Sequence, residues 1–146
     1  MKVLLQRVSS ATVTVDGATV GAINGGLLAL VGFERGDDEA MVRKLAARTV
    51  HMRLFAGADG RFSRSLVDSG GGVLAVPQFT LCADTRKGRR PDFTPAMPPS
   101  PARQMFGLFT AALREAGAAA VESGRFGAHM EVALVNDGPV TILLQR

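Results

Sequence analysis

The amino-acid sequence predicts a single α/β domain of the α+β type, with a mixed, mostly antiparallel sheet or partial barrel and two main helices. Apolar runs rich in β-branched residues cover residues 3–33, 73–81 and 130–144, and such runs are typical of strands. Residues 39–49 and 101–116 instead repeat their apolar side chains at helical spacing. The order strands, helix, strand, helix, strands favours one sheet with helices packed on it.

Length and composition place residues 1–146 in one globular domain. The chain is 47% hydrophobic and 21% charged, and it is long enough to bury a core. No apolar run approaches the ~18 residues of a membrane span, and Lys2 and Arg7 come too early for a signal peptide. We therefore expect a cytoplasmic protein with no membrane partner. Cys82 is the only cysteine, which excludes an internal disulfide and a thiolate metal cluster.

Three strands are predicted before any helix. Val3 to Val15 alternates as a strand does, Asp16-Gly17 is a hairpin signal, and residues 19–23 form the return strand. The continuous apolar run Leu27 to Phe33 is typical of a strand that is buried on both faces. An edge strand left open at either terminus would favour a dimer.

The two helices have recognisable starts. Asp37-Asp38-Glu39 supplies an N-cap and first-turn acids, and the buried face of this helix comprises Val42, Leu45, Ala46 and Thr49. Its end is left open, because residues 52–55 also fit a short strand. The second helix is expected to begin with Ser100 as N-cap and Pro101 at the first helical position, and to end at Gly117. Its predicted buried stripe consists of Met105, Phe106, Phe109, Ala112, Leu113 and Ala116.

The segments between the helices contain the first candidate site. Residues 61–67 are short and mixed, and 69–72 are interpreted as a flexible break. The strand from Val73 is interrupted at Pro77, which cannot donate to a ladder. This places Gln78, Phe79 and Thr80 at a strand terminus with free backbone amides, where functional residues are often found.

A long loop spans residues 83–99, and a loop of this length in a compact domain is more often functional than idle. Arg86, Lys87, Arg89 and Arg90 fall within five residues of it. These cations indicate either a solvated loop or a loop that faces phosphates. The net charge of +4 permits an anionic partner without identifying it.

Residues 136–141, Asn-Asp-Gly-Pro-Val-Thr, are interpreted as a rigid corner between two strands. Asn, Asp and Gly tolerate turn dihedrals, and Pro139 fixes its own φ and removes a donor. A plain hairpin connection is the alternative.

The usual catalytic constellations are missing from the sequence. His51 and His129 have no carboxylate at metal-ligand spacing and are interpreted as structural, and neither a metal nor a cofactor is expected. No Walker loop, dinucleotide fingerprint or nucleophile elbow occurs. Thr80 is a poor nucleophile without an adjacent base. If the chain is an enzyme, backbone amides and positioning must supply most of the catalysis.

At two motifs the chain resembles a known family. Pro77-Gln78-Phe79-Thr80-Leu81 is similar to the Ser-Gln-Phe-Thr-Leu motif of D-aminoacyl-tRNA deacylases, and residues 136–141 match that family's second motif in full. Segments that agree in order and spacing along the chain extend the resemblance: Gln6-Arg7-Val8, 11–15, 26–28, 89–93 and 124–126.

The resemblance implies a homodimeric hydrolase that cleaves the ester of D-aminoacyl-tRNA, and of glycine mischarged on tRNA(Ala). It implies that Gly138-Pro139, joined by a cis bond, enters the partner's pocket near Gln78, Phe79 and Thr80 and rejects L-amino acids. Arg7 and Met130 match positions that buttress this corner. The RNA 2′-hydroxyl would assist water, and the basic residues of the 83–99 loop would bind the acceptor arm of tRNA, with no DNA partner.

Two alternative functions remain: one follows from positions where the sequence departs from the family motifs, and the other is a function without catalysis. Pro77 replaces the family's serine and resembles a related branch that edits tRNA mischarged with L-alanine, whereas Phe79 and the complete second motif favour the D-specific branch. Gly60-Arg61-Phe62-Ser63 departs from the family's Gly-Lys-Met-Asn, so the resemblance assigns no role to Phe62 or Ser63. A non-catalytic, basic tRNA-binding dimer is the hypothesis from another class.

Overall fold

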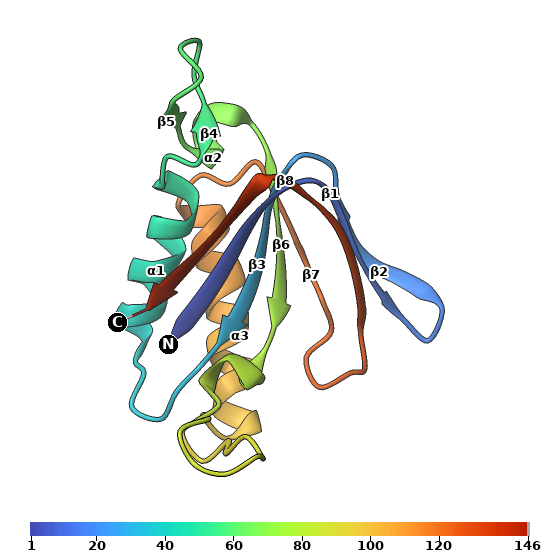
Figure 1. Ribbon diagram of the computed structural model, residues 1–146, viewed down its shortest axis with the longest axis vertical. Coiled ribbons are helices and arrows are strands. Elements are labelled where there is room, and N and C mark those ends of the chain that lie inside the picture. Colours follow the sequence, from blue (N-terminus) through green and yellow to red (C-terminus); the bar gives the residue numbers. More distant parts are fainter. Residues whose placement is uncertain (146) are drawn as a thin grey trace.

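The computed structural model describes residues 1–145, which form one large curved sheet with helices against one side and a separate two-stranded sheet between residues 55 and 64 (Figure 1). The elements, in chain order, are β1 (Lys2–Val15), β2 (Ala18–Ile23), β3 (Gly26–Gly32), α1 (Glu39–His51), β4 (Phe55–Ala56), β5 (Phe62–Arg64), α2 (Leu66–Ser69), β6 (Gly72–Pro77), the 3₁₀ turn η1 (Phe79–Cys82), α3 (Pro99–Glu115), β7 (Ala120–Ser123) and β8 (Glu131–Gln145). No helix within residues 1–145 is both long enough and apolar enough to cross a membrane.

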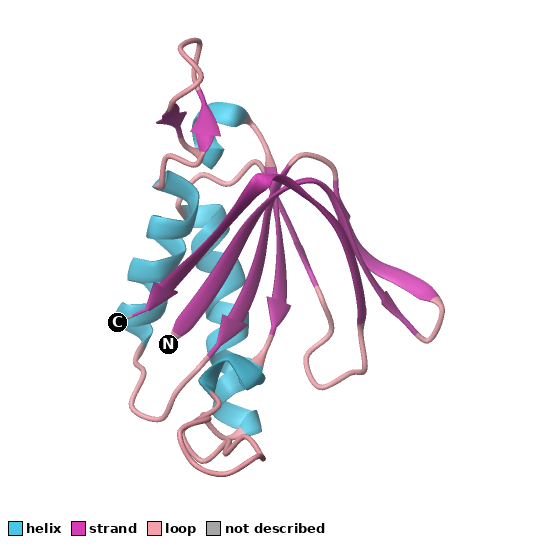
Figure 2. Ribbon diagram, in the orientation of Figure 1, coloured by secondary structure: helices cyan, strands magenta, loops and turns pink. Residues whose placement is uncertain are grey.

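β1 is the strand on which the sheet is built. It pairs antiparallel with β2, β3 and β8, while β3, β6 and β7 run parallel to one another. The six-stranded sheet curls until β2 approaches β7 (Figure 2). At that closure a Cβ on Gly21 would lie 2.9 Å from the carbonyl oxygen of Ser123. The predicted mixed sheet, partial barrel and two main helices are confirmed.

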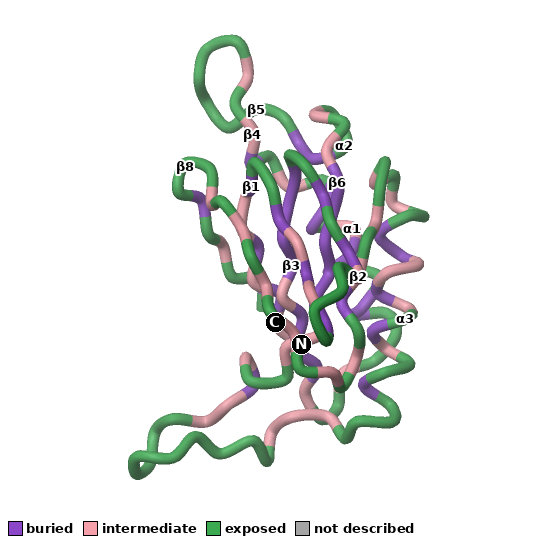
Figure 3. The backbone as a smooth tube through the Cα atoms, turned by 90° about the vertical axis from the view of Figure 1, so that its right-hand side faces the viewer, coloured by how far each residue is buried: buried purple, intermediate pink, exposed green. Residues whose placement is uncertain are grey.

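The curled sheet has a core on each side. Leu27, Ala29 and Val31 of β3 point toward α1 and α3, and Leu28 points into the curl. β3 is therefore buried on both faces, as its continuous apolar run predicts. Figure 3 shows the buried residues concentrated along the sheet and the inner sides of the helices. Each fully buried Leu or Phe of this kind stabilises the fold by about 1.5–3 kcal/mol.

The two helix starts differ in how well they were predicted. Asp38 caps α1 by accepting a hydrogen bond from the Met41 amide at 2.8 Å, as expected. α3 begins at Pro99 with no side-chain cap, so the predicted start at Ser100-Pro101 is wrong. Pro99 has no N–H that needs a cap and presets a helical φ, so a side-chain acceptor is not required there.

Several elements were not predicted, among them β7 and α2. β7 pairs parallel with β6, although its sequence Ala-Val-Glu-Ser has little β propensity. α2 is fixed by a capping box between Ser65 and Asp68 and ends at Gly70 in the left-handed conformation. The segment 69–72 is therefore a helix end and a strand start, not a flexible break.

The corner at residues 136–141 does not divide two strands, and it is not a hairpin. β8 is continuous, and both of its halves pair with β1. Gln6 pairs with Thr141 and Val8 with Asn136, so residues 137–140 bulge opposite Arg7 alone. Pro139 breaks the ladder locally because it has no donor, and the strand resumes beyond it.

We predict that Gly26→Ala strongly destabilises the protein. Gly26 has a φ of +155°, and a Cβ there would lie 2.0 Å from the Gly72 carbonyl oxygen. We expect a loss of about 3 kcal/mol, at the upper end of overpacking penalties, measured as a lower midpoint of urea unfolding. The control is Gly107→Ala in α3, where the new Cβ meets no atom of residues 1–145 within 4 Å and should stabilise the protein by about 0.5–1 kcal/mol. Equal midpoints for the two variants would contradict the prediction.

Candidate functional site

β6 ends at Pro77, and the residues that follow were expected to have free backbone amides. The Gln78 amide donates to the Val31 carbonyl at 2.7 Å, so the expectation is wrong at Gln78. The amides of Phe79 and Thr80, which open η1, have no hydrogen-bond acceptor within residues 1–145. Two adjacent donors are thus available to a ligand at the end of β6.

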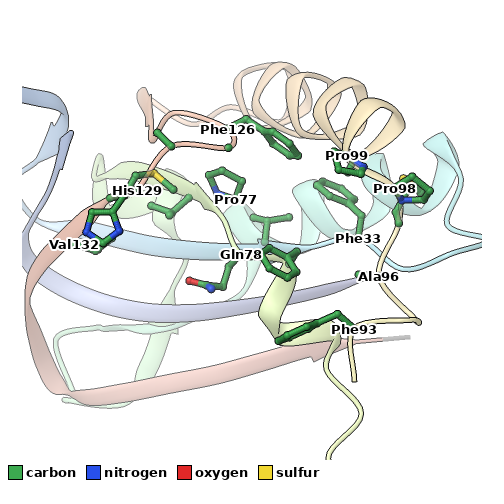
Figure 4. Close-up of a pocket in the computed structure, with 18 of the residues that line it drawn as sticks. Phe33, Pro77, Gln78, Phe93, Ala96, Pro98, Pro99, Phe126, His129 and Val132 are labelled. Atoms are coloured by element: carbon green, nitrogen blue, oxygen red, sulfur yellow. The ribbon is translucent and has the colours of Figure 1, made fainter. Parts of the chain in front are cut away.

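A pocket of about 690 Å³ opens beside these residues (Figure 4). Phe33, Phe93 and Phe126 reach it from three separate segments, and Gln78 and His129 bring polar groups. The ring of Phe79, which is 59% exposed, meets Phe93 edge-to-face with centroids 5.1 Å apart. The pocket is mainly aromatic and apolar and has few polar groups, which is typical of ligand sites.

The structure brings four of the predicted site residues together and leaves the others out. Pro77, Gln78, Phe79 and Met130 all line the pocket. Met130 precedes β8 and is eight residues from Gly138, which corresponds to roughly 26 Å along a strand. Met130 therefore does not lie beside the corner of its own chain, and its predicted contact with the corner of a partner stays a prediction.

Thr80 does not line the pocket. Its hydroxyl oxygen accepts a hydrogen bond from the side-chain amide of Gln78. No His, Asp, Glu or Lys within residues 1–145 makes a hydrogen bond to this hydroxyl, so the base that a threonine nucleophile needs is missing.

Arg7 contacts the corner at Asp137. Its Nε donates to the Asp137 carbonyl at 3.1 Å and its Nη1 to the Leu54 carbonyl at 2.7 Å. The peptide bond between Gly138 and Pro139 is cis, and both residues are exposed. A Cβ on Gly138 would lie 2.8 Å from Val140 Cγ2, so the position excludes any larger residue.

The corner and the pocket of one chain lie at opposite ends of the sheet. Asn136 is level with Val8, Gly26 and Gly72, at the start of β6. The pocket residue Pro77 is at the other end of β6, about 16 Å away at the usual strand rise. In Figure 1 the bend of β8 lies at the top of the sheet and β6 ends toward the bottom. One chain therefore cannot place its own corner in its own pocket.

The predicted basic loop is closed by two backbone hydrogen bonds between Asp84 and Asp92. Within it, the hydrogen bonds and charge of Arg86 lower the pKa of Asp84 to about 2, and Asp84 raises the pKa of Arg86. Lys87, Arg89 and Arg90 are exposed and make no ion pair within the described residues. Three of the four predicted cations thus remain available to an anion.

Sequence reasoning missed the aromatic walls of the pocket. Phe93 and Phe126 lie in segments that carried the family resemblance, and this was the only signal for them. Phe33 was predicted as part of a buried strand, but it also lines the pocket. Linear periodicity gives no information on which distant segments converge.

Comparisons with known proteins agree with the fold and the motifs. The family model for D-Tyr-tRNA(Tyr) deacylase matches residues 4–145. The chain is 58% identical to a D-aminoacyl-tRNA deacylase of Stenotrophomonas maltophilia (strain K279a) over 99% of both chains. It is 56% identical to one of Thermomicrobium roseum, over 99% of this chain and 93% of the relative.

Solved structures give the same architecture. A c-Myc DNA unwinding element binding protein superposes with a TM-score of 0.95 at 36% identity and covers 100% of this chain and 99% of its own. A probable eukaryotic D-amino acid tRNA deacylase superposes with a TM-score of 0.86 at 18% identity, covering 98% of this chain and 97% of its own. At that identity the second likeness shows the fold alone.

Proposed function

Because this chain belongs to the D-Tyr-tRNA(Tyr) deacylase family and is a hydrolase acting on D-aminoacyl-tRNA, we propose that its active centre is shared between two copies. The Phe79 and Thr80 amides of one copy bind the ester, and Gly138-Pro139 of the other excludes L-amino acids. The observation that carries this proposal is that each chain presents an exposed corner and an open pocket at opposite ends of its sheet.

The chemistry rests on the backbone. Attack of water on the ester creates a negative oxygen, and preorganised N–H donors stabilise such an oxygen far better than water does. Phe79 lines the pocket, and Thr80 is the next residue, just outside its lining. The Phe79 and Thr80 amides are the donors without another acceptor in the described chain. The 2′-hydroxyl of the terminal ribose then assists the attacking water. The Thr80 hydroxyl is less suited to this role, because no basic side chain within residues 1–145 is hydrogen-bonded to it.

The corner serves as the chirality gate. D- and L-amino acids exchange a hydrogen and a side chain at Cα, so discrimination requires a surface where the L side chain would lie. Backbone held by Arg7 moves less than a side chain would, and a steric clash rejects the wrong isomer. Glycine, including glycine mischarged on tRNA(Ala), has no side chain to clash and is accepted.

The sheet offers a surface on which a second copy can dock. Within residues 1–145, β8 is an edge strand that pairs only with β1, and open edges invite pairing. Leu4 lies between Leu30 and Leu143 on the face turned away from the helices, and Leu143 is 45% exposed. A symmetric homodimer covers this row and brings each corner toward the partner's pocket.

The pocket and the loop together suit the 3′ end of tRNA. An aminoacyl group alone does not fill about 690 Å³, and aromatic walls stack well on a nucleotide base. Lys87, Arg89 and Arg90 then bind phosphates of the acceptor arm. A tRNA substrate also implies that the enzyme works in the cytoplasm. Membership of a deacylase family sets aside the non-catalytic alternative.

Mixed dimers test the shared site. We combine a Pro139→Ala chain, which has an altered corner, with a Phe79→Pro chain, which lacks one of the two donors. The only intact pocket then lies in the Pro139→Ala chain. If the corner acts on the partner, this pocket receives an unaltered corner, and the ratio of D-Tyr-tRNA to L-Tyr-tRNA hydrolysis returns to the wild-type value.

The Pro139→Ala homodimer is the reference for lost selectivity, and light scattering verifies that each sample is a dimer. A mixed dimer with the same low D/L ratio as that homodimer would show that the corner acts within its own chain. L-Ala-tRNA and Gly-tRNA complete the substrate panel. Hydrolysis of L-Ala-tRNA by the wild type would favour the L-alanine-editing alternative indicated by Pro77.

Thr80→Ala tests the backbone mechanism. The change removes the acceptor of one neutral hydrogen bond, worth about 0.5–1.5 kcal/mol, and leaves the Thr80 amide in place. We therefore expect kcat for D-Tyr-tRNA to fall by less than about tenfold. A loss of several orders of magnitude would instead identify the hydroxyl as the nucleophile.

The double variant Arg89→Ala and Arg90→Ala tests the loop. Each lost phosphate contact should reduce the slope of log K against log salt by about 0.7–0.9, so KM rises and its salt dependence flattens. Arg86→Ala is the matched control, because Arg86 is already neutralised by Asp84 at 2.6 Å. Steady-state kinetics at salt concentrations between 50 and 200 mM, on the order of physiological ionic strength, measure KM and its salt dependence for each variant. An unchanged KM in the double variant removes the loop from the RNA interface.

A further inference from the structure

A second aromatic contact lies beside the corner. The guanidinium carbon of Arg7 lies 5.4 Å from the centre of the Phe62 ring. Phe62 sits on β5 of the small β4–β5 hairpin, opposite Ala56. It is 52% exposed and belongs to neither hydrophobic core. The ring therefore packs on Arg7 and not into the interior.

The other contacts of the Arg7 guanidinium are polar and lie along its edge. Nε is directed to Asp137 and Nη1 to Leu54, and the Asp137 carboxylate lies 3.4 Å from Nε. These contacts fix the edge of the guanidinium. A cation that lies over an aromatic ring is attracted to the face of that ring, so the contact with Phe62 adds a further restraint on the guanidinium.

We infer that Phe62 is a positioning residue for the chirality gate: through Arg7 it sets the orientation of Gly138-Pro139, and so the discrimination between D- and L-aminoacyl-tRNA. This inference rests on the proposed function of the corner. A Cβ placed on Gly138 would lie only 3.0 Å from Arg7 Nη2, so the corner and the guanidinium are in close contact. A rotated guanidinium therefore shifts the corner.

The variants separate the ring's π face from its bulk. Phe62→Ala removes both, Phe62→Leu keeps an apolar side chain without the π face, and Phe62→Tyr keeps the ring. The matched control is Val67→Ala, which truncates another exposed apolar residue of the same region, 40% exposed on α2.

The kinetic readout is the ratio of kcat/KM for D-Tyr-tRNA to that for L-Tyr-tRNA. We expect Phe62→Ala and Phe62→Leu to lower it by about 2- to 5-fold, the equivalent of the ~0.5–1 kcal/mol of an exposed cation–π pair. Phe62→Tyr and Val67→Ala should keep the wild-type ratio. In an Arg7→Ala background, Phe62→Ala should have no further effect, because the two residues act through one contact.

A second readout does not depend on catalysis. The exchange of the Arg7 Nε–H with water, followed by NMR, should accelerate in Phe62→Ala and Phe62→Leu and stay slow in Phe62→Tyr. If Phe62 orients Arg7 but the corner does not select between D and L substrates, the Arg7 Nε–H exchange accelerates while the D/L ratio stays at its wild-type value. If Phe62→Ala leaves both the exchange and the ratio at their wild-type values, or if Phe62→Leu behaves as wild type in both, the inference about Phe62 is overturned.

Discussion

The bulge of β8 opposite Arg7 is the constraint on which the functional geometry depends. Residues 137–140 occupy the space that faces a single residue of β1, so Gly138 and Pro139 project from the sheet while the strand continues on both sides. Hydrogen bonds from a charged group are worth about 1.5–3 kcal/mol each, and Arg7 makes two of them to backbone carbonyls. The bond to the Asp137 carbonyl is the one that reaches the corner, and by these figures it exceeds the exposed cation–π contact with Phe62. We therefore assign the main restraint on the corner to Arg7 and a smaller one to Phe62.

The same continuity of β8 separates the corner from the pocket. A hairpin at residues 136–141 would have reversed the chain and released the C-terminal segment from β1. Because both halves stay on β1 instead, Gly138-Pro139 is fixed at the end of the sheet where β6 begins, and Pro77 and Phe79 are fixed at the end where β6 stops. The separation follows from strand register, which loop motion cannot change.

Much of this fold is encoded locally, and those parts were predictable. The first three strands, the Asp38 cap and the end of β6 at Pro77 follow from alternation, capping and a missing donor. β7 was not predictable in this way, because Ala120 to Ser123 become a strand only through pairing with β6. The corner was misinterpreted because Pro139 interrupts a ladder locally, whereas the pairing on either side is decided by β1.

The residues of the candidate site likewise fall into those that were predictable from local sequence and those that were not. Pro77, Gln78 and Phe79 are neighbours in sequence, so their shared location was evident from the motif. Met130, Phe33 and Phe126 join them only after folding, and no periodicity links those segments. The corner was recognisable as a motif, but its distance from the pocket required the register of four strands.

The proposed reliance on backbone groups is consistent with the few titratable side chains that line the pocket. A chirality gate must be rigid, and an amide held by strand pairing or a turn has less freedom than a side chain with several rotatable bonds. The same property suits the oxyanion donors, since preorganised dipoles need no reorganisation during the reaction. At Pro77 the sheet ends, Gln78 makes the last rung with Val31, and the next two amides are left without acceptors in the described chain. The pair of donors on which the proposed chemistry rests is therefore formed where the 3₁₀ turn η1 begins, directly after this last rung.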